Sequence, residues 1–456
     1  MGMGSLINKL FLRIRGACGF LAQRPAMMLL FFFLFPMVVS LICHATTIPL
    51  LLGDSEPGFF IAPDSIWFHS RAVEIAGRMK AEGFSAWCLR PWGQLPVGIA
   101  SLIYYVFGTN PYFLLPFNAL LHCGATYFFF RILLYLSGSR AAAFVVSLIY
   151  LIFPTATLWY TQLHKDGVCQ LGVLLYLYGW IRLADGSLAL NLRHVLVTLF
   201  LIAAGLLLSR LSRPYVVTMM MGVMVIGMLL VVVPALIRAL KKKAGWPDFA
   251  KRSILAACCF AVLFVIPKDE HYEKMINGEL PRLNATHGVE WHPSGWPGAI
   301  ESMGHSIANY RARFIQLCPD QGSGIDTNVE FNSIPEILAY LPRAAQQGLL
   351  APFPSEWFSH GSSAFSTLTR LVSSFEMLVV YIGLALLPLL FVRCEKRLPL
   401  AMVTAICASM ATIYVFSVPN LGTVYRVRYI YLLLLAGFGL VQGFMLLTTK
   451  TNEVNR

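Results

Sequence analysis

Several acidic and basic residues of this sequence stand at the ends of long apolar runs. Asp64 begins an amphipathic segment, and His164, Lys165 and Asp166 form a short turn between two apolar runs. A carboxylate can take the proton of a hydroxyl group as that group attacks a substrate. We therefore predict Asp64 and Asp166 as catalytic residues, with His164 and Lys165 as substrate-binding neighbours. Two alternatives stay open, because Asp64 is also a good helix N-cap and Lys165 and Asp166 could simply pair in water.

Four arginines lie at the ends of apolar runs on what we expect to be the same side of a membrane. They are Arg210, Arg213, Arg426 and Arg428. The planar guanidinium group binds phosphate oxygens through two parallel hydrogen bonds. We predict that these arginines bind a phosphate group of the substrate. The alternative is that they reach towards lipid headgroups, as long cationic side chains do at membrane surfaces.

Metal and redox chemistry find little support in the sequence. The ten cysteines include no CxxC pair, which argues against zinc and iron–sulfur sites. A divalent cation, Mg²⁺ or Mn²⁺, held by Asp64, Asp166 and a histidine stays open, although no ligand spacing links these residues. Cys88 and Cys318 could form a disulfide in an oxidising compartment.

The composition defines the elements that must position these side chains. The chain has 456 residues, of which 57% are hydrophobic and 12% charged, whereas a soluble domain has about 25% charged residues. This excludes a soluble globular enzyme, a disordered protein and a fibrous repeat. The apolar runs are continuous, as in Met27 to Leu52 and Val216 to Ile237, and do not alternate as in a membrane β-barrel. We predict an all-α polytopic membrane protein.

Ten membrane-spanning helices fit the apolar runs. We place them at 27–50, 113–134, 141–160, 168–184, 195–212, 215–237, 253–267, 371–392, 398–417 and 428–447. The positive-inside rule places basic segments in the cytoplasm, which gives a cytoplasmic N-terminus (1–26) and C-terminal tail (448–456). The first seven spans form a membrane domain (27–267) with an outer loop at 53–112. A large outer loop (268–370) and three further spans (371–447) complete the chain.

One segment, Leu95 to Phe107, decides this topology. As a helix it would reach only about 18 Å, at 1.5 Å per residue, which is too short to cross roughly 30 Å of hydrocarbon. We therefore predict an amphipathic or interfacial helix here, following a first one from Asp64 to Ala76. If the segment crossed the membrane, the basic run from Arg238 to Arg252 would face outward. Orientation in the membrane thus explains the net charge of +13, and no nucleic-acid partner is expected.

Several of these features together resemble the GT-C class of polytopic membrane glycosyltransferases. They are an acidic residue at the start of an amphipathic helix (Asp64), an interfacial helix ending in Phe107-Gly108, a proline in a span (Pro154) and the Lys165-Asp166 pair in the next outer turn. The nearest likeness is to the bacterial protein-mannosyltransferase-like and aminoarabinose-transferase-like enzymes. The likeness covers about residues 27–185, and beyond them it depends on topology and on the segment Asn420 to Arg428. The sequence departs from the class in having Asp64-Ser65 where the class has an Asp-Glu pair.

The resemblance implies transfer of a sugar from a polyprenyl-phosphate carrier to a glycan, lipid or protein acceptor. The reaction would take place at the periplasmic face of the bacterial inner membrane, with inversion at the anomeric carbon. Asp64 would be the general base, Asp166 would orient the acceptor or assist the base, and the arginines would stabilise the leaving phosphate. Two other functions stay open. One is a polysaccharide polymerase or ligase that uses polyprenyl-pyrophosphate-linked glycans, and the other is a transporter or flippase for lipid-linked sugars, although we find no internal repeat.

Overall fold

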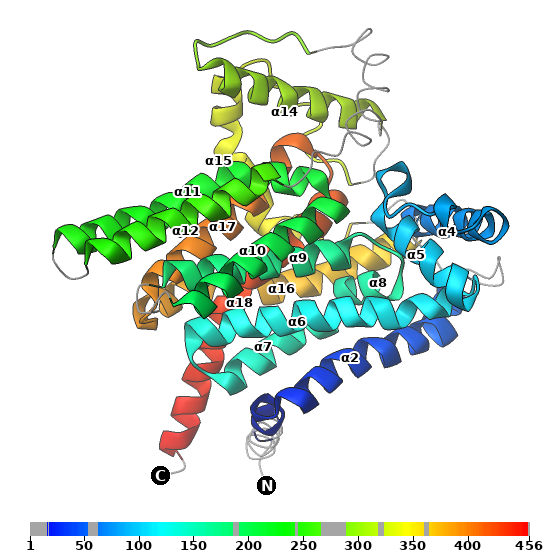
Figure 1. The fold of residues 1–456 in the computed structure, drawn as a ribbon, viewed down its shortest axis with the longest axis horizontal. Helices are drawn as coiled ribbons and strands as arrows, with labels where there is room; N and C mark the ends of the chain where they lie inside the picture. Colours follow the sequence, from blue (N-terminus) through cyan, green and yellow to red (C-terminus); the bar gives the residue numbers. More distant parts are fainter. Residues whose placement is uncertain are drawn as a thin grey trace.

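The computed structural model describes residues 16, 18–52, 63–185, 191–241, 245–265, 289–317, 323–359 and 364–454, and within them it contains helices but no β-strand. The α-helices are α2 (Pro25–Ile42), α3 (Ile48–Leu52), α4 (Pro63–Glu82), α5 (Leu95–Phe107), α6 (Leu115–Ser137), α7 (Arg140–Ile152), α8 (Pro154–Thr161), α9 (Asp166–Ala184), α10 (Leu192–Ser212), α11 (Pro214–Leu240), α12 (Trp246–Val265), α14 (Gly298–Leu317), α15 (Ile334–Leu350), α16 (Ala364–Arg393), α17 (Arg397–Ser417) and α18 (Leu421–Val454). The long helices form one bundle (Figure 1).

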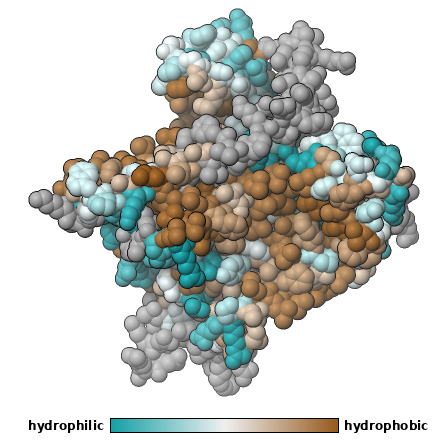
Figure 2. Space-filling view, viewed as in Figure 1, coloured by the Kyte–Doolittle hydropathy of each residue, from teal (hydrophilic) through white to brown (hydrophobic). Residues whose placement is uncertain are grey.

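Eight helical segments are long and apolar enough to cross a membrane. They are Pro25–Leu50, Pro111–Ser137, Asp166–Ala184, Leu192–Ser212, Pro214–Leu240, Arg370–Arg393, Arg397–Ser417 and Leu421–Thr448. Helices α7 and α8 meet at an angle of 59° at Pro154, and together they make a ninth span if they count as one. The chain is therefore an all-α protein with several membrane-spanning helices, as the sequence predicts. Figure 2 shows a broad hydrophobic surface across the bundle, with hydrophilic groups gathered towards its edges.

The predicted span at 253–267 is not among these eight. Its described part lies in α12, whose first two turns carry Asp248, Lys251 and Arg252. These three charges leave α12 out of the helices that are apolar enough to cross a membrane, although it has 20 residues. Residues 266 and 267 of the predicted span lie outside the described residues. The other nine predicted spans coincide with the eight apolar segments and the bent pair.

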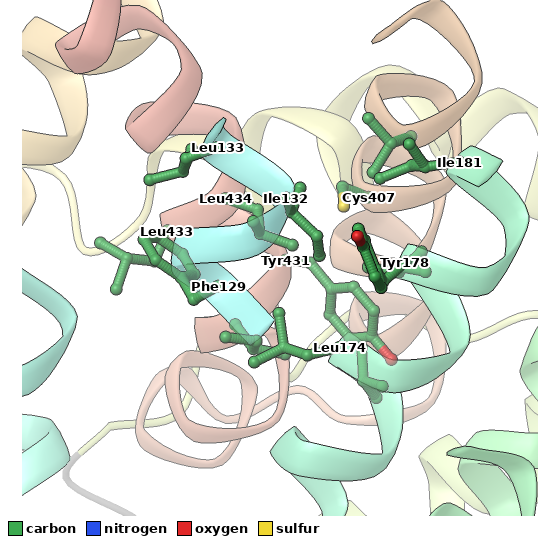
Figure 3. Packing of buried hydrophobic residues seen from close by; sticks show 14 of the residues in the cluster. Phe129, Ile132, Leu133, Leu174, Tyr178, Ile181, Cys407, Tyr431, Leu433 and Leu434 are labelled. Carbon is green, nitrogen blue, oxygen red and sulfur yellow. The ribbon is translucent and has the colours of Figure 1, made fainter. Parts of the chain in front are cut away.

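Helix α9 lies at the centre of the bundle. It is apolar around its whole circumference, and 83% of its most apolar window is buried. Such a helix needs partners on every side. Figure 3 shows Leu174, Tyr178 and Ile181 of α9 among residues of its neighbours, which include Phe129 and Ile132 of α6, Cys407 of α17 and Tyr431 of α18.

Two glycines allow α9 and α10 to pack with their backbones in contact. A Cβ atom on Gly205 of α10 would lie 2.5 Å from the carbonyl oxygen of Gly172 of α9 and 2.6 Å from the amide nitrogen of Tyr176. Small residues permit this close approach in membrane bundles, where dispersion contacts replace the hydrophobic effect as the main attraction. The contact holds α10, and hence Arg213 directly after it, against α9.

Helices α4 and α5 form a small unit beyond one end of the bundle (Figure 1). Helix α5 has the bounds predicted for this segment and, with 13 residues, is too short to cross a membrane, which confirms that the segment is a non-spanning helix. Helix α4 is longer than expected and continues to Glu82. Phe68, Ala72 and Ile75 of α4 pack with Val97 and Tyr104 of α5, and Leu163 of the α8–α9 turn joins the same cluster. The unit is thus seated directly on the turn that precedes Asp166.

Helices α14 and α15 project from the bundle on another side (Figure 1). Helix α15 runs from Ile334 to Leu350 within the predicted large outer loop. Buried Arg311 of α14 donates hydrogen bonds to the carbonyl oxygens of Asp326, Val329 and Val415 at 2.6, 2.8 and 3.2 Å. These bonds tie the described part of the predicted outer loop to the end of α17. The start of α2 and the end of α18 lie on the side away from α4 and α14 (Figure 1).

Candidate functional site

The turn between α8 and α9 carries His164 and Lys165 and leads into Asp166. Three side chains from other elements donate hydrogen bonds to its backbone carbonyl oxygens. His44 donates to Thr161 at 2.9 Å and Asn118 to Gln162 at 3.0 Å. Ser65 donates to Leu163, also at 3.0 Å. A buried carbonyl without a partner would cost free energy, so these bonds favour one conformation of the turn. The turn is therefore positioned by α4, α6 and the π-helical segment Cys43–Thr47 at once.

Asp166 is the first residue of α9, and its side chain is only 4% exposed. Arg213 donates a hydrogen bond from Nη2 to Asp166 Oδ1 at 2.8 Å and another from Nη1 to the Tyr215 hydroxyl at 2.5 Å. Burial by itself would lower the pKa of Arg213, but the adjacent Asp166 carboxylate outweighs it and raises that pKa well above its usual range. The pair is thus a buried, hydrogen-bonded ion pair and not the exposed Lys165–Asp166 pair of the simpler interpretation.

Asp64 lies near the same place but faces solvent. It belongs to the first turn of α4, which begins at Pro63, and its side chain is 56% exposed. Arg426 Nη1 lies 3.5 Å from Asp64 Oδ2, and Arg426 Nε lies 3.8 Å from Asp166 Oδ2. One guanidinium group therefore bridges the two carboxylates that the sequence singled out. We call Asp64, Asp166, Arg213 and Arg426 the charge cluster.

His164 and Lys165 both experience the field of the charge cluster. Burial lowers the pKa of His164 to about 4, although Asp166 opposes this, so the ring is neutral at neutral pH. Burial, and then the positive charge of Arg213, lower the pKa of Lys165 to about 8. The Lys165 ammonium also lies 5.6 Å from the centre of the Phe68 ring of α4. A lysine with this pKa changes charge within the physiological range.

The other two predicted arginines are not joined to the charge cluster. Arg210 ends α10 one turn before Arg213, and no hydrogen bond or ion pair links it to a described residue. Arg428 is 1% exposed, and its guanidinium group donates to the carbonyl oxygens of Gln347, Gly348 and Ala351 at the end of α15. The Gln347 carbonyl also accepts from the amide of Ala351, and a helix C-terminus leaves its other last carbonyls without intrahelical partners. Arg428 thus caps α15, and the structure gives its predicted contact with substrate no support.

A large cavity opens beside the charge cluster. Its volume is about 780 Å³, and Arg426 forms part of its wall. The rest of the lining is mostly apolar or hydroxyl-bearing and comes from Cys43–Ile48, α8, α16 and the start of α18, with Arg370 and Glu356 as further charged residues. Cavities of 300–1,000 Å³ with few polar groups are typical of small-molecule sites. The cavity can hold an apolar chain whose polar end reaches Arg426.

Sequence reasoning did not assign a role to Glu376, a carboxylate within the apolar helix α16. It is 2% exposed and accepts hydrogen bonds from the amide of Thr155 at 2.8 Å, the Thr155 hydroxyl at 2.6 Å and the Tyr425 hydroxyl at 2.6 Å. It thereby caps the start of α8 and holds the residue before Arg426. The sequence could have marked Glu376 as functional, because an ionisable residue inside a membrane span is a functional candidate by default.

The charge cluster does not fit a divalent cation. Among the described residues, no three His, Cys, Asp or Glu side chains are close enough to hold a metal ion. Both carboxylates already face Arg426, and Asp166 also pairs with Arg213. The charge of these carboxylates is thus already met by the two arginines, and a divalent cation would also need further oxygen ligands. One member of the possible Cys88–Cys318 disulfide, Cys318, lies outside the described residues.

Comparison with protein-family models found no matching family, and comparison with curated proteins and with solved structures found no match. The geometry of the charge cluster and its cavity is therefore the basis for the proposed function.

Proposed function

We propose that this chain is a membrane glycosyltransferase that moves a sugar from a polyprenyl-phosphate carrier to a glycan, lipid or protein acceptor. One observation carries the proposal: Arg426 contacts both candidate carboxylates and also lines the mostly apolar cavity. A polyprenyl-phosphate sugar has a long apolar chain, a phosphate and a hydroxyl-rich head. The cavity, the arginine and the exposed carboxylate supply a matching group for each part.

The proposed reaction is a direct displacement at the anomeric carbon. The acceptor hydroxyl forms a bond to that carbon while the bond from the carbon to the phosphate oxygen breaks. The hydroxyl proton passes to Asp64, and the bonding electrons leave with the lipid phosphate. Arg426 stabilises the charge that grows on the phosphate, since a fixed cation is most effective away from bulk water. Attack opposite the leaving group inverts the anomeric configuration.

The two carboxylates have different surroundings, which suits different roles. Asp64 is half-exposed and can exchange its proton with water after each turnover. Asp166 is buried and bound to Arg213, so it is better suited to orienting Arg426 than to accepting a proton. We assign the general base to Asp64 and the positioning role to Asp166. A periplasmic active site in a bacterial inner membrane completes the proposal.

The test is sugar transfer or release from a radiolabelled polyprenyl-phosphate monosaccharide by the purified protein. Asp64→Asn should reduce turnover by about 10²–10⁴-fold, the usual loss on removal of a general base. Glu74→Gln is the matched control, because Glu74 is an exposed carboxylate of the same helix that pairs with Arg71, outside the charge cluster. Equal turnover by both variants would refute the assignment of Asp64. Turnover of oligosaccharides on polyprenyl pyrophosphate, with none of any monosaccharide carrier, would replace the proposal by a polymerase.

A further inference from the structure

A second cavity lies at the end of the bundle remote from the charge cluster. Its volume is about 360 Å³, and it is lined by the ends of α6 and α16, the segment Cys394–Lys396 before α17, and Gln442 and Met445 of α18. Its lining includes Tyr135, Arg393, Glu395, Lys396 and Gln442. Asp185, directly after α9, accepts a 2.5 Å hydrogen bond from the Tyr135 hydroxyl, so this cavity and the charge cluster lie at opposite ends of α9.

The side-chain amide of Gln442 points to a missing ligand. Gln442 is 1% exposed, and its Nε2 atom has no hydrogen-bond partner among the described residues. A buried amide without a partner costs roughly 1–3 kcal/mol on protein-based scales. This amide lines the cavity, so a bound group with a hydrogen-bond acceptor would remove that cost.

Two cationic side chains, Lys396 and Arg393, lie at the wall of this cavity. Lys396 Nζ lies 3.3 Å from Asp185 Oδ2 and 3.5 Å from the centre of the Tyr135 ring, which holds the ammonium at the cavity wall. Arg393, at the end of α16, lines the cavity and forms no hydrogen bond or ion pair with a described residue. One carboxylate, Glu395, also lines the cavity and is exposed. Asp185 thus meets part of the charge of Lys396, while Arg393 and the Gln442 amide keep donors for a bound group.

We propose that this cavity binds a phosphate-bearing anion, through Arg393, Lys396 and the Gln442 amide. Guanidinium and ammonium groups together with an amide N–H are the usual donors to phosphate oxygens. Two sources share this chemistry, namely the headgroup of an acidic phospholipid and free phosphate. The lipid is the better fit, because Leu389 and Val392 in the last turns of α16 are 39% and 71% exposed and offer apolar surface for acyl chains near the headgroup level.

The proposal stands independently of the glycosyltransferase function, because no residue of the charge cluster takes part. For the variant Gln442→Leu, it predicts a higher stability without ligand but a weaker stabilisation by ligand. Gln442→Leu should raise the thermal stability of the lipid-free protein, since it removes a buried amide without a partner. The same variant should lose stabilisation by the ligand. A change that merely damaged the fold would lower both.

The experiment measures the melting temperature of the purified full-length protein in detergent during titration with phosphatidylglycerol, with phosphatidylcholine as the uncharged comparison. The wild type should be stabilised by phosphatidylglycerol and less by phosphatidylcholine. Arg393→Gln and Gln442→Leu should each weaken the apparent affinity for phosphatidylglycerol about tenfold, the effect of losing one hydrogen bond to a charged group. Arg397→Gln is the matched control, because Arg397 is an exposed cation nearby that does not line the cavity.

Titration with inorganic phosphate separates the two sources. Stabilisation by phosphatidylglycerol but not by millimolar phosphate identifies a lipid headgroup, and stabilisation by phosphate alone identifies the free anion. Either result supports the site if Arg393→Gln and Gln442→Leu each weaken the binding about tenfold. Equal stabilisation of the wild type, Arg393→Gln and Gln442→Leu by both ligands would overturn the proposal. An equal loss in Arg397→Gln would also overturn it, because binding would then reflect surface charge in general.

Discussion

At the scale of single residues, the main feature is that two carboxylates share one arginine in different surroundings. Asp64 and Asp166 both approach Arg426, yet one side chain is 56% exposed and the other 4%. An exposed ion pair contributes little to stability, whereas a buried carboxylate depends on its partners. The two aspartates look equivalent in the sequence, but their different burial gives them different dependence on their partners.

This difference predicts unequal effects of removing the two charges. Asp166→Asn leaves Arg213 buried beside a neutral amide, and breaking a buried pair costs about 3–5 kcal/mol. Asp64→Asn removes an exposed charge and should cost less than about 1 kcal/mol. Thermal denaturation of both purified variants in detergent checks this. Equal losses of melting temperature would mean that Asp166 is not buried with Arg213 as the structure has it.

Lys165 should make stability depend on pH. Its pKa is about 8 in the folded protein and 10.5 in an unperturbed lysine, so between these values the unfolded chain binds more protons. Stability must then rise with pH from about 8 to about 10.5. Lys165→Met, neutral at every pH, should lack this part of the rise, measured as melting temperature against pH. Lys80→Met, at an exposed position of α4, should keep it, and a matching change in both variants would contradict the assignment.

At the scale of elements, α9 connects the two ends of the molecule. It begins with Asp166 of the charge cluster and is followed by Asp185 beside the second cavity. Its close contact with α10 positions Arg213, since that residue comes directly after α10. The charge cluster can therefore form only if α9 and α10 pack closely.

Gly205→Ala should disturb this contact. The new Cβ atom would lie 2.5 Å from the carbonyl oxygen of Gly172, and overpacking typically costs about 1–3 kcal/mol. Gly222→Ala in α11 is the control, because its Cβ atom meets nothing within 4 Å, and alanine favours a helix by up to about 1 kcal/mol over glycine. Melting temperatures should thus move in opposite directions. A neutral Gly205→Ala would show that the helices separate easily.

At the scale of the whole molecule, polar chemistry lies at both ends of an apolar bundle. The charge cluster occupies one end with α4 and α5, and Arg393, Lys396 and Arg252 lie at the other. The positive-inside rule predicts that the second end faces the cytoplasm. The start of α2 and the end of α18 lie on the side away from α4, as cytoplasmic termini require (Figure 1).

Cysteine labelling tests this orientation. Native Cys88 is exposed and lies between α4 and α5, so a membrane-impermeant maleimide added to intact, mildly reduced cells should label it. Arg397→Cys, in a chain without other cysteines, should be labelled only after the membrane is permeabilised. The opposite pattern would invert the predicted topology and place the charge cluster in the cytoplasm.

The sequence by itself determined the class of the protein and most of its helices. Continuous apolar runs require helices, because every backbone polar group must be satisfied inside a bilayer. The length of Leu95–Phe107 excluded a span, and polar residues at the ends of apolar runs marked Asp64, Asp166, Arg213 and Arg426. These conclusions depend on local composition and length, which a sequence states directly. The predicted span at 253–267 is the one that the described helices do not reproduce, because charges at the start of α12 lie close to its apolar part.

Only the tertiary structure decided which of the marked residues meet. Arg426 and Arg428 are two positions apart and look equivalent in the sequence, yet one bridges Asp64 and Asp166 while the other caps α15. On a helix, residues two apart point about 200° away from each other, at 3.6 residues per turn. Which of them faces the carboxylates depends on how α18 packs against α15 and α16. That packing joins segments far apart in the chain, and no local pattern encodes it.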